Sequence, residues 1–166
     1  MRAPPAATRA RGAGPARGAD LPMFTYRRPV RFAEVDAARL VFFARVHEYC
    51  HDALEAFFAA LPGGYAHLIQ ARDIGIPTVH ISTDFTAPLR YGDVAVFDVE
   101  VLRIGRTSVT FRHTVRREAD GAVCAVIRHV VVTAALATLE PVPVPADVRA
   151  LAAAHLAADG RDGGQP

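Results

Sequence analysis

The chain has no lysine and no tryptophan, so all 19 of its Lys and Arg positions are arginine. Its two cysteines, Cys50 and Cys124, are too few for a disulfide framework and lie in apolar stretches typical of buried thiols. No apolar run approaches the roughly 18 to 20 residues of a membrane-spanning helix. A net charge of +2 is weak evidence for a nucleic-acid partner. We therefore expect a cytoplasmic protein that binds neither membranes nor nucleic acids.

The length of 166 residues suits one domain of ordinary size, and 51% apolar with 22% charged residues is typical of a globular chain. Residues 1–22 are rich in Arg, Ala, Pro and Gly and lack the apolar segment of a secretory signal, so we predict a disordered leader there. The patterned sequence begins at Met23. We expect the domain to cover residues 23–145, and residues 146–166 to form a short helix and a flexible tail.

Polar and apolar residues alternate over 24–32, with Val30 and Phe32 on one face, which predicts a first strand. A helix of about five turns follows, because apolar residues recur at the spacing of one helical face. These residues are Val46, Cys50, Ala53, Leu54, Phe57 and Leu61. Pro62 and two glycines end this helix, and a shorter one is expected over 65–73.

From residue 78 the apolar period changes from helical to two. The strands that this period predicts cover 78–85, 94–104, 107–117 and 122–138, and a last helix is expected over 146–158. Short turns at 105–106 and 120–121 require antiparallel hairpins. The segment 123–137 is nearly all apolar, which predicts a central strand covered on both faces. The result is an α+β fold in which a curved five-stranded antiparallel sheet wraps one long helix.

The HExxH pattern of zinc hydrolases occurs in the predicted long helix. His47 and His51 would lie one turn apart on one face and share a zinc ion, with Glu48 deprotonating a bound water. The extended form of the pattern is absent, because Leu54 and Phe58 stand where its glycine and third histidine would be. Almost everything after residue 77 is predicted as strand, which offers no helical carboxylate ligand. We therefore expect both histidines to line a packing helix and no metal to bind.

Asp36 stands shortly before the same helix, where an aspartate is most often an N-cap. The loop over 37–42 is too apolar for an ordinary exposed connection, so we expect it to be buried, with Asp36 beside it. The helix N-terminus supplies free N–H groups and a positive dipole end for an oxyanion. A carboxylate next to such donors can attack or hydrate a carbonyl, which makes Asp36 a candidate nucleophile or general base.

The order of these features resembles the hotdog-fold acyl-CoA thioesterases, in particular the 4-hydroxybenzoyl-CoA and 1,4-dihydroxy-2-naphthoyl-CoA thioesterase groups. The resemblance covers about residues 24–145. The segments that carry it are VRFAEVDAA at 30–38, LVFF at 40–43, CH at 50–51, PTVH at 77–80, DFTAP at 84–88 and GD at 92–93.

This resemblance implies a thioesterase that hydrolyses acyl-CoA without a metal or cofactor, with an aromatic acyl group slightly favoured. It also implies sheets joined edge to edge in a homodimer, active sites at the dimer interface, and dimers assembling to a homotetramer. Asp36 falls on the catalytic carboxylate of the family, and the backbone N–H of Phe43 on the group that polarises the thioester carbonyl. Two residues depart from the family: Arg39 stands where glycine is usual, and Arg45 where asparagine is common.

Four further residues are candidates for substrate binding: Val41, Phe42, His80 and Arg106. Val41 and Phe42 lead into the helix, His80 matches a position in the naphthoyl-CoA group, and Arg106 could hold nucleotide phosphates with its guanidinium fork. Other arginines considered for the phosphates are Arg90, Arg103 and Arg128. Most of the phenylalanines are expected in the core, with one or two flooring the acyl site.

Three alternatives to a thioesterase stay open at the level of sequence. Within the same fold, the chain could be a hydratase or dehydratase that relies on a pocket histidine, or a non-catalytic acyl-CoA binder. From another class, it could be an HExxH zinc hydrolase.

Overall fold

The structure is a computed structural model that describes residues 23–157, so the predicted leader and the last part of the predicted tail lie outside the described residues. Within the described residues, three α-helices, one short 3₁₀ helix and seven strands follow one another. They are β1 (Phe24–Pro29), η1 (Phe32–Glu34), α1 (Phe43–Phe58), α2 (Gly64–Gln70), β2 (Ile74–Gly75), β3 (Thr78–Phe85), β4 (Val94–Ile104), β5 (Ser108–Arg117), β6 (Val123–Val132), β7 (Ala134–Ala135) and α3 (Ala146–Ala154).

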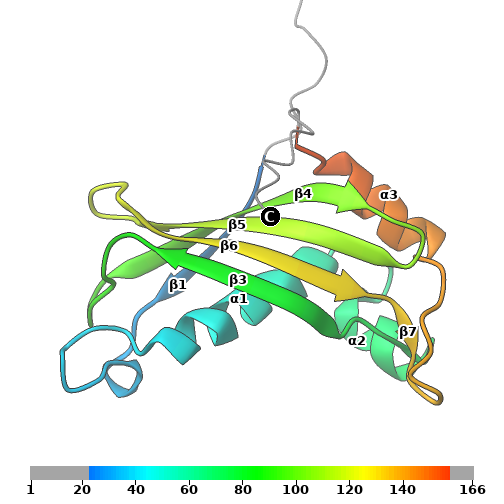
Figure 1. The fold of residues 1–166 in the computed structure, drawn as a ribbon, viewed down its shortest axis with the longest axis horizontal. Coiled ribbons are helices and arrows are strands. Elements are labelled where there is room, and N and C mark those ends of the chain that lie inside the picture. The colour runs from blue at the N-terminus through cyan, green and yellow to red at the C-terminus, as the bar shows by residue number, and fades with distance from the viewer. Residues whose placement is uncertain (1–22, 158–166) are drawn as a thin grey trace, which may run out of the picture.

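Five strands form one antiparallel sheet in the order β1-β4-β5-β6-β3, and β2 pairs with β7 in a small second sheet. Figure 1 shows α1 lying along one face of the large sheet, with α3 beside β4 at one end. This arrangement confirms the predicted α+β hotdog fold. Among the described residues, no helix has the length and apolar character that crossing a bilayer requires.

The core lies between α1 and the sheet. The buried side chains of α1 are Val46, Tyr49, Cys50, Ala53, Leu54, Phe57 and Phe58. Phe57 makes edge-to-face contacts with Phe24 of β1 and Phe111 of β5, with ring centroids 5.4 and 5.5 Å away. Burying an aromatic or aliphatic side chain of this size contributes about 1.5 to 3 kcal/mol. The helical face predicted from apolar spacing is therefore confirmed.

The first strand is shorter than predicted. It ends at Pro29, and the next N–H, that of Val30, donates to the Asp93 carbonyl in the loop before β4. The chain then turns through η1, so Phe32 does not share a buried face with Val30. Its side chain is 75% exposed and packs edge to face on Tyr91.

The apolar stretch predicted as one strand over 122–138 forms two strands, β6 and β7. β6 ends at Val132, and Thr133 turns the chain into β7, held by hydrogen bonds from its N–H to the Thr107 carbonyl and from its hydroxyl to the Val142 carbonyl. β6 has a neighbouring strand on each side, but one of its faces is only partly covered, and Arg128 on that face is exposed. The prediction of a strand covered on both faces is therefore wrong for this chain. The helices predicted over 65–73 and 146–158 are both shorter than expected.

Candidate active site

The loop between η1 and α1 is a closed turn. Val35 and Val41 form an antiparallel bridge, and inside it the Asp36 N–H donates to the Leu40 carbonyl at 2.8 Å. The Arg39 N–H donates to the Asp36 carbonyl at 2.9 Å. Arg39 has φ of 63°, a left-handed conformation that non-glycine residues rarely adopt and that costs about 1 kcal/mol or more. The backbone at Arg39 thus takes the shape that glycine would take without strain.

The Asp36 carboxylate holds this turn with one oxygen. Oδ1 accepts hydrogen bonds from the Ala38 N–H at 2.8 Å and the Leu40 N–H at 3.4 Å. Within residues 23–157, Oδ2 accepts no hydrogen bond from another residue. The interpretation of Asp36 as an N-cap is wrong, because the N-cap residue of α1 is Phe42, and no side-chain hydrogen bond caps this helix. One carboxylate oxygen is therefore left for chemistry.

The first free backbone donor of α1 is the N–H of Phe43. The two preceding N–H groups are occupied: Val41 donates to the Leu89 carbonyl at 2.8 Å, and Phe42 to the Glu34 carbonyl at 3.0 Å. The first N–H groups of a helix have no intrahelical partner, and in the described part of the chain no carbonyl accepts from Phe43 or Ala44. The positive end of the helix dipole adds to these donors.

A cavity of about 540 Å³ brings these groups together. Asp36, Val41, Phe42 and Phe43, four of the residues predicted from the sequence, all line it. The other lining residues are Leu40, Val46, Phe85, Thr86, Ala87, Pro88, Leu89, Cys124 and Ala125. The cavity is thus an apolar chamber with one carboxylate and one helix N-terminus in its wall.

The expectation that this loop is buried is wrong for the single chain. Asp36 is exposed, and the rings of Phe42 and Phe43 are 45% and 58% exposed. Phe85, at the end of β3 and on the same cavity, is 50% exposed. The apolar residues of the loop border an open cavity instead of entering the core, so only a further surface could bury them.

The sequence between residues 30 and 151 matches the family model of the thioesterase-like superfamily. The chain belongs to the thioesterase-like superfamily. It is 33% identical over 122 residues to a 1,4-dihydroxy-2-naphthoyl-CoA hydrolase of Nostoc punctiforme, a match that covers 72% of this chain and 81% of the relative. The predicted family and the predicted thioesterase class of enzyme are therefore confirmed.

Solved structures agree with this fold. A 1,4-dihydroxy-2-naphthoyl-CoA thioesterase from Synechocystis superposes with a TM-score of 0.73 at 24% identity, covering 80% of this chain and 96% of that one. A gentisyl-coenzyme A thioesterase superposes with a TM-score of 0.69 at 25% identity, covering 77% of this chain and 98% of that one.

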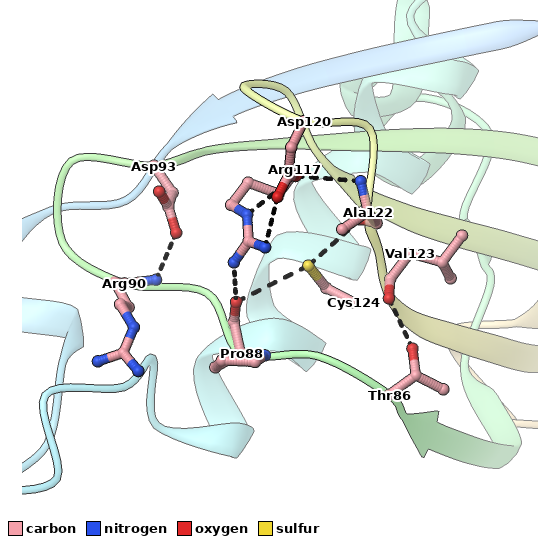
Figure 2. Close-up of polar contacts among 9 residues, drawn as sticks. All are labelled: Thr86, Pro88, Arg90, Asp93, Arg117, Asp120, Ala122, Val123 and Cys124. Carbon is pink, nitrogen blue, oxygen red and sulfur yellow. Dashed lines mark hydrogen bonds and ion pairs between the residues drawn. The ribbon is translucent and has the colours of Figure 1, made fainter.

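One wall of the cavity is anchored to the β5–β6 hairpin. Figure 2 shows the Arg117 guanidinium between Pro88 and Asp120: it donates to the Pro88 carbonyl at 2.9 Å and forms a two-pronged pair with Asp120 at 3.0 and 2.7 Å. The Thr86 hydroxyl donates to the Val123 carbonyl at 2.6 Å. These bonds hold the segment 86–89, whose Leu89 carbonyl in turn accepts the Val41 N–H. The wall and the Asp36 loop are therefore tied together.

Two predicted substrate-binding residues lie away from the cavity of the same chain. His80 is exposed on β3 opposite Val130, on the half of the strand remote from Phe85. Arg106 lies in the β4–β5 turn, which Figure 1 places at the other end of the sheet from the N-terminus of α1. Both residues stay predictions, because the single chain does not bring them to Asp36.

The HExxH pattern gathers no zinc site in the described part of the chain. The His47 ring nitrogen Nε2 lies 2.9 Å from the Thr83 hydroxyl, and Glu48 pairs with Arg45 on the exposed side of α1. No third ligand accompanies His47 and His51 among the described residues.

Glu34 braces the candidate site, and sequence reasoning missed it. It is only 9% exposed, and its carboxylate pairs with Arg28 of β1 at 2.8 Å. The same carboxylate accepts hydrogen bonds from the Tyr49 hydroxyl of α1 at 2.5 Å and the Arg31 N–H at 2.7 Å. Its carbonyl accepts the Phe42 N–H. Glu34 therefore ties β1, α1 and the Asp36 loop into one unit.

The electrostatics of this unit favour an ionised Glu34. Burial by itself raises the pKa of the carboxyl, but hydrogen bonds from Arg28 and Tyr49 outweigh it and lower the pKa from 4.5 to about 2. The Arg28 guanidinium also lies over the Tyr49 ring, 3.7 Å from its centroid. No local pattern connects these three residues, although a second acid two positions before Asp36 was a visible signal.

Replacing Glu34 by glutamine should lower the free energy of unfolding at pH 7 by about 3 kcal/mol. The reason is that the pKa of Glu34 falls from 4.5 to about 2 on folding, and each pKa unit corresponds to about 1.4 kcal/mol of stability. The wild type should lose this contribution as the pH falls from about 4.5 towards about 2, whereas the variant should not. Urea unfolding at pH 7 and pH 3 measures both effects. Glu48→Gln, on the exposed face of α1, is the matched control and should change stability little. An equal loss in both variants would contradict this role for Glu34.

Proposed function

We propose that this protein hydrolyses the coenzyme A thioester of an aromatic acyl group. Asp36 acts as nucleophile or general base, and the Phe43 N–H at the start of α1 stabilises the oxyanion. The observation that carries the proposal is the placement of the free Asp36 oxygen and the free Phe43 N–H on one apolar cavity. The proposed place of action is the cytoplasm.

The chemistry needs only these groups and water. With the thioester carbonyl oxygen on the Phe43 N–H, the carbonyl carbon becomes more electrophilic, and the negative charge that develops is placed at a helix N-terminus. Asp36 Oδ2 can attack that carbon, which breaks the C–S bond, releases coenzyme A as a thiolate and leaves an acyl-aspartyl anhydride. Water then cleaves the anhydride and restores the carboxylate. In the general-base route Asp36 takes the proton of the water that attacks the thioester.

The geometry of the loop suits this role. Because Oδ1 is held by the Ala38 and Leu40 N–H groups, the carboxylate is oriented before substrate arrives. The left-handed Arg39 closes the same turn. The strained backbone at Arg39 thus helps to place the carboxylate, and Arg39 adopts the conformation that we expect of the family's glycine.

An aromatic acyl group is supported by the cavity and by the relatives. The cavity volume is in the range of small-molecule sites, and its lining is mostly aliphatic and aromatic. The curated relative is named for a naphthoyl thioester and one similar structure for a gentisyl thioester, and both acyl groups are aromatic.

The functional unit that we propose is a dimer. β3 is an edge strand of the large sheet, and its exposed apolar side chains include Val79 at 58%, Ile81 at 37% and Phe85 at 50%. An exposed apolar edge of this length favours pairing with another strand. Antiparallel pairing of two β3 strands would set the His80 half of each beside the Phe85 half of the other.

This pairing would give the distant candidates a place. His80 of one chain, and the Arg106 turn at the same end of its sheet, would lie beside the Phe85 end of β3 in the other chain, which borders the cavity of that chain. His80 would then border the acyl group, and Arg106 the nucleotide phosphates. We also propose that two dimers assemble into a homotetramer. Light scattering, which measures the mass of the wild type in solution, tests this assembly.

Asp36→Asn should fold, bind coenzyme A and lose at least about 100-fold in kcat/KM, because the amide can neither attack nor accept a proton. A thiol-release assay with an aromatic acyl-CoA measures the loss, and circular dichroism checks the fold. Asp147→Asn is the matched control: Asp147 begins α3 and pairs with Arg72, outside the cavity lining. Wild-type thiol release in Asp36→Asn would contradict the role proposed for Asp36. Absence of thiol release in the wild type, with hydration or dehydration of an acyl-CoA that His80→Ala abolishes and Asp36→Asn spares, would favour a dehydratase.

Ala87→Phe should reduce the cavity and lower kcat/KM for a bicyclic aromatic acyl-CoA at least about tenfold, while acetyl-CoA turnover changes less. Ala87 is half-buried in the cavity wall. Ala153→Phe, at an exposed position of α3, is the control. An equal effect on both substrates would contradict the assignment of this cavity to the acyl group.

Ile81→Arg should break the dimer, because it places a charge on the edge strand that we propose to be shared. Light scattering should then report the mass of one 17.8 kDa chain, against a multiple of it for the wild type. Leu139→Arg is the control, since Leu139 is also apolar and 73% exposed but lies in a loop. A wild type that is monomeric at micromolar concentration would refute the shared edge.

A further inference from the structure

A cysteine and two histidines meet in the core, away from the cavity. Cys50 of α1 and His113 of β5 are 0% exposed, and His129 of β6 is 2% exposed. Their sulfur and ring-nitrogen atoms all lie within 4.8 Å of one another. None of the three lines the cavity of the proposed thioesterase site. The cluster is therefore a separate feature of the molecule that thioester hydrolysis does not use.

His129 is oriented by its neighbours. Its Nε2 lies 2.7 Å from the Thr78 hydroxyl, and its Nδ1 lies 3.7 Å from the Cys50 sulfur. With Nε2–H donating to Thr78, the lone pair of Nδ1 points at the thiol. A histidine ligand that binds metal through one nitrogen commonly donates its other N–H to an oxygen in this way.

His113 has no such neighbour. In the described chain neither of its ring nitrogens has a hydrogen-bond partner, and both are buried. Its surroundings include the rings of Phe111 and His129, with centroids 6.2 and 5.6 Å away. Leaving a buried donor or acceptor unpaired costs about 1 to 3 kcal/mol. This cost would be removed by an ion that took the ring as a ligand.

We propose that Cys50, His113 and His129 together bind one thiophilic d¹⁰ metal ion, Cu⁺ or Zn²⁺. Thiolate and neutral imidazole are the ligands that both ions prefer. The ion displaces the thiol proton of Cys50 to solvent and takes its place.

The geometry and the charge of the cluster suit such an ion. Metal–ligand bonds of about 2.0 to 2.3 Å bring ligand atoms within about 4 Å of one another, so binding needs the three side chains to close by about 1 Å or less. A Cu⁺ thiolate is neutral, whereas a Zn²⁺ thiolate leaves one positive charge in a buried apolar site. Since burying net charge is costly, the structure favours Cu⁺ over Zn²⁺.

The effect of the ion would be structural. It would join α1 to β5 and β6 at the centre of the interface between the helix and the sheet. Because the site is closed to solvent, the ion would enter as the chain folds. Binding to the folded state alone would also raise the melting temperature.

The experiment is to unfold the full chain, refold it without oxygen in the presence of one equivalent of Cu⁺ or Zn²⁺, desalt it and count metal per chain. The wild type should retain one ion, with a thiolate-to-metal absorption band and a raised melting temperature. Competition with a chelator should show tighter binding of Cu⁺ than of Zn²⁺. Retention of no metal in either arm would overturn the proposal.

Variants separate this site from the other thiol and from the HExxH histidines. Cys50→Ser keeps the shape of the side chain and should weaken binding more than 100-fold, whereas Cys124→Ala should bind as the wild type does. Thr78→Val, at an exposed position of β3, should weaken binding about 10 to 100-fold. Metal that survives Cys50→Ser but is lost in His51→Gln would overturn the proposal in favour of an HExxH site. Turnover of acyl-CoA is not needed for any of these measurements.

Discussion

The packing of one apolar face of α1 against the sheet is the constraint on which the rest of this structure depends. A single helix has one buried face, and here the strands wrap around it so that Phe57 meets rings from β1 and β5. Everything else is placed relative to this contact. The N-terminus of α1 opens on the cavity, its Tyr49 reaches Glu34, and its Cys50 faces two histidines of the sheet.

The candidate site arises because the backbone N–H groups just before α1 already donate hydrogen bonds. Val41 and Phe42 give their N–H groups to carbonyls of other segments, so Phe43 is the first donor left over. The two carboxylate oxygens of Asp36 differ in the same way. Oδ1 accepts hydrogen bonds that hold the turn, whereas Oδ2 accepts none in the described chain. Bonds made for the fold thus leave a defined acceptor and a defined donor on one cavity.

Two buried polar groups that lie against α1, Glu34 and His113, differ in their hydrogen bonding. Glu34 has three donors around its carboxylate, so its charge is retained and it braces the Asp36 loop. His113, in contrast, has no partner for either nitrogen in the described residues. The ion proposed above would supply the partner that His113 lacks among these residues.

The sequence by itself determined the α+β class, the helical face and the antiparallel strands, because apolar period and short turns are local properties of the chain. It also pointed to Asp36, Val41, Phe42 and Phe43, which lie within eight positions of one another. Only the tertiary structure decided that this loop is exposed, that Glu34 braces it, and that Cys50 meets His113 and His129. Glu34 meets Tyr49, 15 positions away, and Cys50 meets His129, 79 positions away. No local pattern records which of these side chains become neighbours when the sheet closes on the helix.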